Sequence, residues 1–256
     1  MPIAKSHKNT GGFIGTTGTY LSGGVFSNRM ETALAYTDRW DVVRNGLLLH
    51  LDAKDARSYS GSGTTWADLS GTGSTAAWEA TPTWNGSYFS NTNNISASFT
   101  LSSTPSNVTS VEMTMKINTI AGMPFGWQNY DVYSQGGPLG YNTGAGDTYG
   151  LTTAQVTALG LTSAVKHYVF EMRSDLPVVN NKIYVNGTLQ SLSQVASSEA
   201  PANRNFNSGV GRISCWKADN NYRMDMNLYQ FKIYNRVLSQ DEINYNYSIA
   251  KMKFGF

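Results

Sequence analysis

The acidic, histidine and cysteine residues of this chain do not form the patterns that catalytic or metal sites need. Retaining glycoside hydrolysis uses two carboxylates about 5 Å apart. A Glu-x-Asp segment would place two such groups on one face of a strand, yet no Glu-x-Asp segment occurs in the sequence. The histidines, His7, His50 and His167, offer few options for a zinc site. Cys215 follows a strand-like run and is expected to be a small buried hydrophobe. We therefore predict no enzyme activity and no cofactor.

The segment SYSGSGTTWADLSGTGS, residues 58–74, leaves two interpretations open. In the first, its glycines permit tight turns, Asp68 accepts hydrogen bonds from nearby amides, and Trp66 anchors the loop to the core. In the second, Asp68 is a calcium ligand. Calcium takes six to eight oxygens and usually more than one carboxylate, so the turn is favoured. Chelators are then expected to change thermal stability very little.

Aromatic side chains suggest a carbohydrate site, because ring faces stack on sugars and long loops commonly carry binding sites. Residues 123–150 read as an irregular run rich in rings and amides. The candidates are Trp127, Tyr130, Tyr133 and Tyr141 in this run, with Trp216 and Tyr222 on a second loop. The favoured alternative is that these rings pack loop to loop or against a neighbouring subunit.

Composition excludes several classes of function. The 256 residues carry a net charge of +2, which is too weak to bind nucleic acid by charge alone. No apolar run is long enough to insert in a membrane, and the N-terminal segment lacks the apolar region of a secretory signal. The single cysteine permits no intrachain disulfide, which favours synthesis in a reducing cytoplasm.

Strand patterns dominate from residue 46 onward. Apolar residues alternate in 95–101, 111–117 and 168–172, which is typical of half-buried antiparallel strands packed as two sheets. Asn186-Gly187 is a strong hairpin signal. In the segment 224–233 the parity of the apolar residues changes near Tyr229, which predicts a bulge or bend there.

Two helices are expected to interrupt the strands, and a third is an option. Residues 151–161 predict a short helical insertion that Gly160 stops. Ser239 and Glu242 form a capping-box pattern at the start of a C-terminal helix. Residues 30–43 could form another short helix.

Residues 1–45 are interpreted as an extended N-terminal arm without a core of its own. Its start is rich in glycine, and its apolar residues come singly or in pairs. Residues 1–30 hold Lys5, Lys8 and Arg29 but no acidic residue, so we expect the arm to dock on a partly acidic partner or on sister subunits, with folding back onto its own domain as the alternative. The expected docking residues are Lys5, Lys8, Phe13, Ile14, Tyr20, Leu21, Val25, Phe26 and Arg29.

A family resemblance covers residues 46–256. NGLLLHLDAKDARSYSGSGTTWADLSGTGS, VEMTMKIN, VKHYVFEMR, NKIYVNGTLQ and NLYQFKIYNRVLSQDEINYNY resemble, in this order, pieces of laminin-G-like, concanavalin A-like jelly-roll domains. SYSGSGTTWADLSG and the ending IYNRVLSQDEINYNYSIAKMKFGF most resemble such domains in virion proteins of tailed bacteriophages, including cyanophages.

The resemblance implies an all-β fold, a two-sheet antiparallel jelly-roll sandwich with the arm, the helical insertion and the C-terminal helix added. Calcium-binding relatives carry a second Asp just before the closing strand, where this chain has Tyr229. The implied function is that of a non-enzymatic virion structural protein, a capsid decoration or a fibre or tail accessory. It would be made in the host cytoplasm, located in the virion, homo-oligomeric and bound to other virion proteins through its arm. The alternative is a carbohydrate-binding module for a host-surface glycan.

Overall fold

The computed structural model describes residues 41–144, 147–196, 204–217 and 221–256. The part from Val42 to Phe256 is one compact unit. Most of the predicted arm, and most of the helix considered for residues 30–43, lies outside the described residues. None of the described helices is long and apolar enough to cross a membrane.

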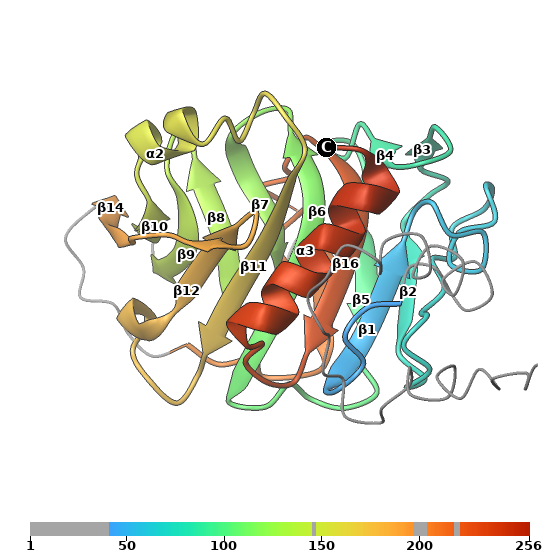
Figure 1. Ribbon diagram of the computed structural model, residues 1–256, viewed down its shortest axis with the longest axis horizontal. Coiled ribbons are helices and arrows are strands. Elements are labelled where there is room, and N and C mark those ends of the chain that lie inside the picture. The colour runs from blue at the N-terminus through green and yellow to red at the C-terminus, as the bar shows by residue number, and fades with distance from the viewer. Residues whose placement is uncertain (1–40, 145–146, 197–203, 218–220) are drawn as a thin grey trace, which may run out of the picture. The chain divides into compact units, whose positions relative to one another are not determined.

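The fold is a jelly-roll sandwich of two antiparallel sheets, as the sequence predicts (Figure 1). The first sheet, here called sheet A, contains β13 (Thr188–Leu189), β12 (Lys182–Val185), β11 (Lys166–Arg173), β6 (Val108–Ile117), β16 (Met226–Tyr234), β4 (Phe89–Ser90) and β3 (Thr83–Trp84) in that order, and β1 (Leu47–Asp52) also pairs with β16. Sheet B contains β14 (Ser193–Ala196), β10 (Asp147–Leu151), β9 (Leu139–Gly144), β8 (Asp131–Gln135), β7 (Ala121–Gly126), β15 (Val210–Ile213), β5 (Ala97–Thr100) and β2 (Thr75–Trp78).

The core lies between the two sheets and is rich in aromatic rings. Alternate residues of each strand face inward, as period-2 patterning requires. Phe125 of sheet B packs against Phe170 and Phe231 of sheet A, with ring centroids 5.3 and 5.8 Å away. These contacts join strands that are far apart in the sequence, so the core holds the two sheets together.

Two local predictions about strands are confirmed. Asn186 and Gly187 both have positive φ, 49° and 79°, at the turn between β12 and β13. The register of β16 against β6 shifts between Leu228 and Gln230, so Tyr229 is the extra residue of a bulge. Because of the bulge, the side chains of Tyr229 and Gln230 both face away from the core, whereas those of Leu228 and Phe231 are buried in it.

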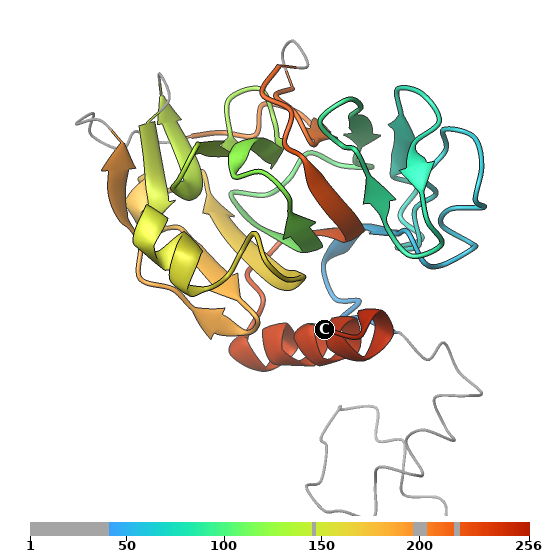
Figure 2. The same ribbon diagram turned by 90° about the horizontal axis from the view of Figure 1, so that it is seen from above.

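The helical predictions are also confirmed, with shorter bounds for the insertion. Helix α2 spans Thr153–Ala158, and a 3-10 turn, η1, spans Val178–Asn180. Helix α3 spans Gln240–Phe254 and begins with the expected capping box of Ser239 and Glu242. Figure 2 shows α3 lying along the outer side of the sandwich, against sheet A.

A layer of buried charges lies between α3 and the outer face of sheet A. The Glu112 carboxylate contacts His167 Nε2 at 2.9 Å, the Lys232 ammonium, and the side-chain amide of Asn246 at 2.7 Å. Burial alone would raise the pKa of Glu112, but Lys232 and His167 lower it to about 2. Glu112 is therefore ionised at neutral pH, although it is fully buried.

A second ion pair of the same layer lies nearer the end of α3. The Lys253 ammonium contacts Asp52 Oδ2 at 2.7 Å, and Gln230 Nε2 donates to the same oxygen at 2.8 Å. Burial, followed by the charges of Lys232 and Lys253, lowers the pKa of His50 well below its usual value. His50 of β1 and His167 of β11 are thus both packed inside this layer. The layer fixes where α3 sits, because each buried charge needs its partner.

Candidate ligand-binding surface

Three of the six carbohydrate candidates belong to the core, which corrects the expectation for them. Trp127, Tyr130 and Tyr141 are all fully buried. Phe206 packs against Trp127 and Tyr130 at centroid distances of 4.9 and 5.0 Å. The Tyr130 hydroxyl donates to the Arg173 carbonyl at 2.7 Å. These rings have no face open to a sugar.

The correction has a simple geometric cause. Residues 123–150 form most of β7 together with β8, β9 and β10, so their side chains alternate between the two faces of sheet B. Tyr130 and Val132 lie in the core, whereas Asp131 and Tyr133 lie on the opposite face. Proximity in the sequence therefore groups rings that the sheet separates.

The other three candidates come together outside the core and form what we call the Tyr222 cluster. The Tyr222 ring lies edge-on to Tyr133 of β8, with centroids 5.7 Å apart, and to Trp216 at 6.3 Å. Tyr222 is 52% exposed, Trp216 is half-buried and Tyr133 is buried. The indole N–H of Trp216 donates to the Gln128 carbonyl at 3.2 Å, which holds that ring over the β7–β8 turn.

Tyr222 is held in a backbone conformation that bulky residues rarely adopt. Its φ is 58°, in the left-handed region, which costs free energy for a non-glycine residue and is found preferentially at functional sites. The Tyr222 carbonyl accepts a hydrogen bond from Met123 N–H at 2.7 Å. A Cβ on neighbouring Gly122 would lie 2.6 Å from that same carbonyl oxygen. The close approach to β7 therefore fixes the backbone that carries the exposed ring.

Ion pairs anchor the residue next to Tyr222. The Arg223 guanidinium contacts Glu79 Oε2 at 2.7 Å and donates to the Asn94 carbonyl at 3.1 Å. The other oxygen of Glu79 contacts Arg212 of β15 at 2.6 Å. One carboxylate thus joins the Tyr222 loop to the far strands of sheet B, which pre-organises the cluster.

Sequence reasoning missed a buried carboxyl on this face, Asp131 of β8. It pairs in register with Gly126 and bonds to the side chain of Asn142. Burial raises its pKa to about 7. The signal in the sequence was the alternation of Asp131 and Tyr133 with the inward-facing Val132. Neither Gly126 nor Asn142 supplies the second carboxylate that glycoside hydrolysis needs.

The loop of residues 58–74 behaves as the turn that the sequence favours. Asp68 Oδ1 accepts hydrogen bonds from the backbone N–H groups of His50 at 2.8 Å and Ser70 at 2.9 Å. The hydroxyls of Ser70, Thr72 and Ser74 all donate to the Leu48 carbonyl. Asp68 thus binds the loop to β1. Among the described residues, no group of three His, Cys, Asp or Glu side chains could hold a metal ion.

Comparisons with known proteins identify the fold and no more. No family model and no curated protein matches the chain. Solved structures do match: the receptor-binding domain of a botulinum neurotoxin C/D mosaic serotype aligns with a TM-score of 0.54 and 14% identity, and covers 80% of this chain and 52% of its own.

Two further botulinum neurotoxin structures match in the same way. That of botulinum neurotoxin D has a TM-score of 0.53 and 14% identity over 80% of this chain and 53% of its own. The third comes from work on botulinum neurotoxin type C, whose cell entry depends on interaction with two ganglioside molecules. It has a TM-score of 0.54 and 14% identity, and the alignment covers 80% of this chain and 51% of its own. The chain spans about half the length of these structures.

Proposed function

We propose that this domain is a non-catalytic carbohydrate-binding module and that the Tyr222 cluster is its glycan-binding site. The observation that carries the proposal is the exposed ring of Tyr222, which a strained backbone and close packing on β7 hold in place. A rigid aromatic face loses little entropy when it stacks on a sugar. The exposed side chain of Gln128 offers directional hydrogen bonds beside it.

The chemistry of the cluster supports binding over hydrolysis. Asp131 has a pKa suited to proton transfer, but it is buried and bonded to an amide. Glu79 lies between two guanidinium groups, which keep its carboxylate occupied. Two of the matching structures described above are receptor-binding domains, and the third concerns a toxin whose cell entry depends on gangliosides. This likeness of fold agrees with a glycan ligand.

Replacing Tyr222 by alanine tests the proposal. The variant is expected to lose at least about tenfold in affinity for the glycan that the wild type binds best on an array, because the main stacking face is gone. Isothermal titration with that glycan measures the loss. The melting temperature should not fall, since the ring is largely exposed and its left-handed backbone suits alanine no worse than tyrosine.

Leu189→Ala is the matched control, because Leu189 is 49% exposed but lies on sheet A. It should bind the glycan as the wild type does. Equal affinity for wild type and Tyr222→Ala would show that the ligand site lies elsewhere. If no glycan on the array binds saturably, the proposal of a carbohydrate-binding module is wrong.

We propose further that the domain is displayed on a bacteriophage virion, as a capsid decoration or a fibre or tail accessory, in homo-oligomeric form. What supports this is the sequence resemblance of residues 46–256 to virion domains. In this setting the N-terminal arm docks on other virion proteins while the jelly roll faces outward. The two proposals are compatible, since a displayed lectin would serve both roles.

Deleting residues 1–40 separates the arm from the domain. The truncated protein is expected to keep a cooperative melt and an all-β circular dichroism spectrum, because the compact unit begins at Val42. Co-sedimentation with phage particles should be lost. Attachment equal to that of the full chain would exclude the docking role of the arm, and failure to fold would place the arm in the core.

A further inference from the structure

A second aromatic surface lies on the opposite sheet, where the bulge in β16 turns Tyr229 outward. Its ring lies 4.8 Å from that of Tyr88, which precedes β4, and 5.2 Å from that of Phe254 in the last turn of α3. All three rings are partly exposed. They come from three elements that meet only in the folded chain, and we call them, with Asn227 and Lys116, the Tyr229 patch.

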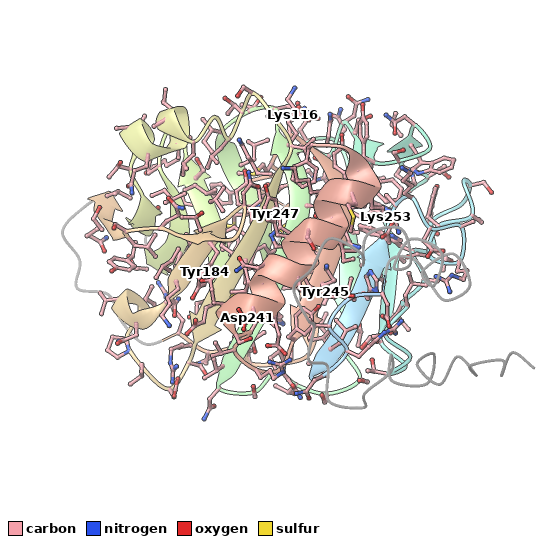
Figure 3. The ribbon with its side chains drawn as sticks, viewed as in Figure 1. Lys116, Tyr184, Asp241, Tyr245, Tyr247 and Lys253 are labelled. Carbon is pink, nitrogen blue, oxygen red and sulfur yellow. The ribbon has the colours of Figure 1, made fainter. Side chains whose placement is uncertain are left out.

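The patch is the part of the outer face of sheet A that α3 leaves open. Residues 112, 114 and 116 of β6 face away from the core, as do Asn227 and Tyr229 of β16. Glu112 is buried in the charged layer under the helix, whereas Lys116 and its register partner Asn227 are partly exposed. Figure 3 shows Lys253 near the C-terminal end of α3 and Lys116 beyond it.

The polar groups of the patch provide hydrogen-bonding capacity beside the rings. Asn118 Nδ2 donates to Asn227 Oδ1 at 3.1 Å and to Asp225 Oδ1 at 3.2 Å. Among the residues that the structure describes, none accepts a hydrogen bond from the amide N–H groups of Asn227 or from the ammonium of Lys116. Ring faces flanked by oriented amides are what a saccharide needs, since its ring has an apolar face and a rim of hydroxyls.

We propose that the Tyr229 patch is a second saccharide-binding site, distinct from the Tyr222 cluster and on the other sheet. A sugar ring stacks on Tyr229, and its hydroxyls bond to Asn227 and Lys116. β-Bulges are frequent next to binding sites because they re-aim a side chain, and Tyr229 is such a re-aimed residue. The inference stands on its own observations and does not require the Tyr222 site.

The test uses the full chain and neutral hexasaccharides, namely cellohexaose, laminarihexaose and maltohexaose, observed by saturation-transfer NMR and titration. The variants are Tyr222→Ala, Tyr229→Ala, Asn227→Ala and the Tyr222→Ala Tyr229→Ala double variant. Tyr222→Ala should still contact a hexasaccharide, and Tyr229→Ala should weaken that remaining binding by about tenfold. Asn227→Ala should also weaken this remaining binding. That variant keeps the test valid if Tyr229→Ala lowers the melting temperature too far for binding to be measured.

Three results would overturn the proposal. The first is that no hexasaccharide binds the wild type. The second is that Tyr222→Ala alone abolishes all binding while Tyr229→Ala binds as the wild type does. The third is that Tyr229→Ala changes the oligomeric state in sedimentation, which would make the patch a contact between copies. If Tyr222→Ala still binds a hexasaccharide and Tyr229→Ala does not, the result supports the Tyr229 patch and rejects the Tyr222 cluster as the site for that sugar. The two proposals can therefore fail separately.

Discussion

Replacing Glu112 by alanine is expected to lower the free energy of unfolding by about 3–5 kcal/mol, because the substitution leaves partners of a buried charge network without their counter-charge. Glu112 is fully buried and contacts Lys232, His167 and Asn246 at once. Without it, no other carboxylate of the described part of the chain contacts the ammonium of Lys232. Urea or guanidinium unfolding, followed by fluorescence, measures the loss.

Two companion variants make this expectation specific. Arg57 is the exposed partner of Asp55, and Arg57→Ala should change stability by no more than about 0.5 kcal/mol. A Glu112→Leu Lys232→Met double variant should recover much of the loss, since removing both charges removes the unpaired one. The free energy of unfolding of Glu112→Ala could instead stay within about 1 kcal/mol of the wild-type value. That result would show that the layer under α3 is not isolated from water and does not fix the position of the helix.

Replacing Trp66 by alanine is expected to cost about 3–5 kcal/mol, the usual loss when a large buried ring leaves a cavity. Trp66 is fully buried, stacks on Trp78 at 5.6 Å with an interplanar angle of 16°, and meets Phe89 edge-on at 4.8 Å. It is the ring that ties the loop of residues 58–74 to the core. The midpoint of denaturant unfolding should fall while the slope stays the same.

Trp66→Phe is the informative control for that cavity. The buried indole N–H of Trp66 has no hydrogen-bond partner among the described residues, so phenylalanine removes an unsatisfied donor while it keeps a ring in the site. Its loss of stability should be clearly smaller than that of alanine. Equal losses for the two variants would mean that the site cannot use a smaller ring, and a negligible loss for alanine would show that the loop is not anchored there.

Local rules predict most of the fold from the sequence. The hairpin at Asn186-Gly187, the bulge at Tyr229 and the capping box at Ser239 each depend on a few neighbouring residues. Alternation identified the long strands β6, β11 and β16. These features follow from backbone geometry that any fold must respect, so the sequence is sufficient to predict them.

The sites depend on contacts that the sequence does not reveal. Sequence order groups Tyr130 with Tyr133, but the strand turns them to opposite faces, and only the packing of the sheets decides which face is open. The Tyr229 patch joins residues separated by more than a hundred positions, as does the pair of Glu112 and Lys232. The topology of the fold brings such residues together, and the sequence indicates that topology only through a family resemblance.

The pairing of β1 with β16 has a consequence for how the domain is made. β1 is the first strand of the compact unit, β16 is the last, and β16 also pairs along most of its length with β6. During synthesis β1 and β6 leave the ribosome long before the strand that completes their sheet, and α3 follows later still. Folding that depends on such distant pairings is slow and leaves strand edges open meanwhile. The nascent chain is therefore expected to need a chaperone's protection until β16 and α3 emerge.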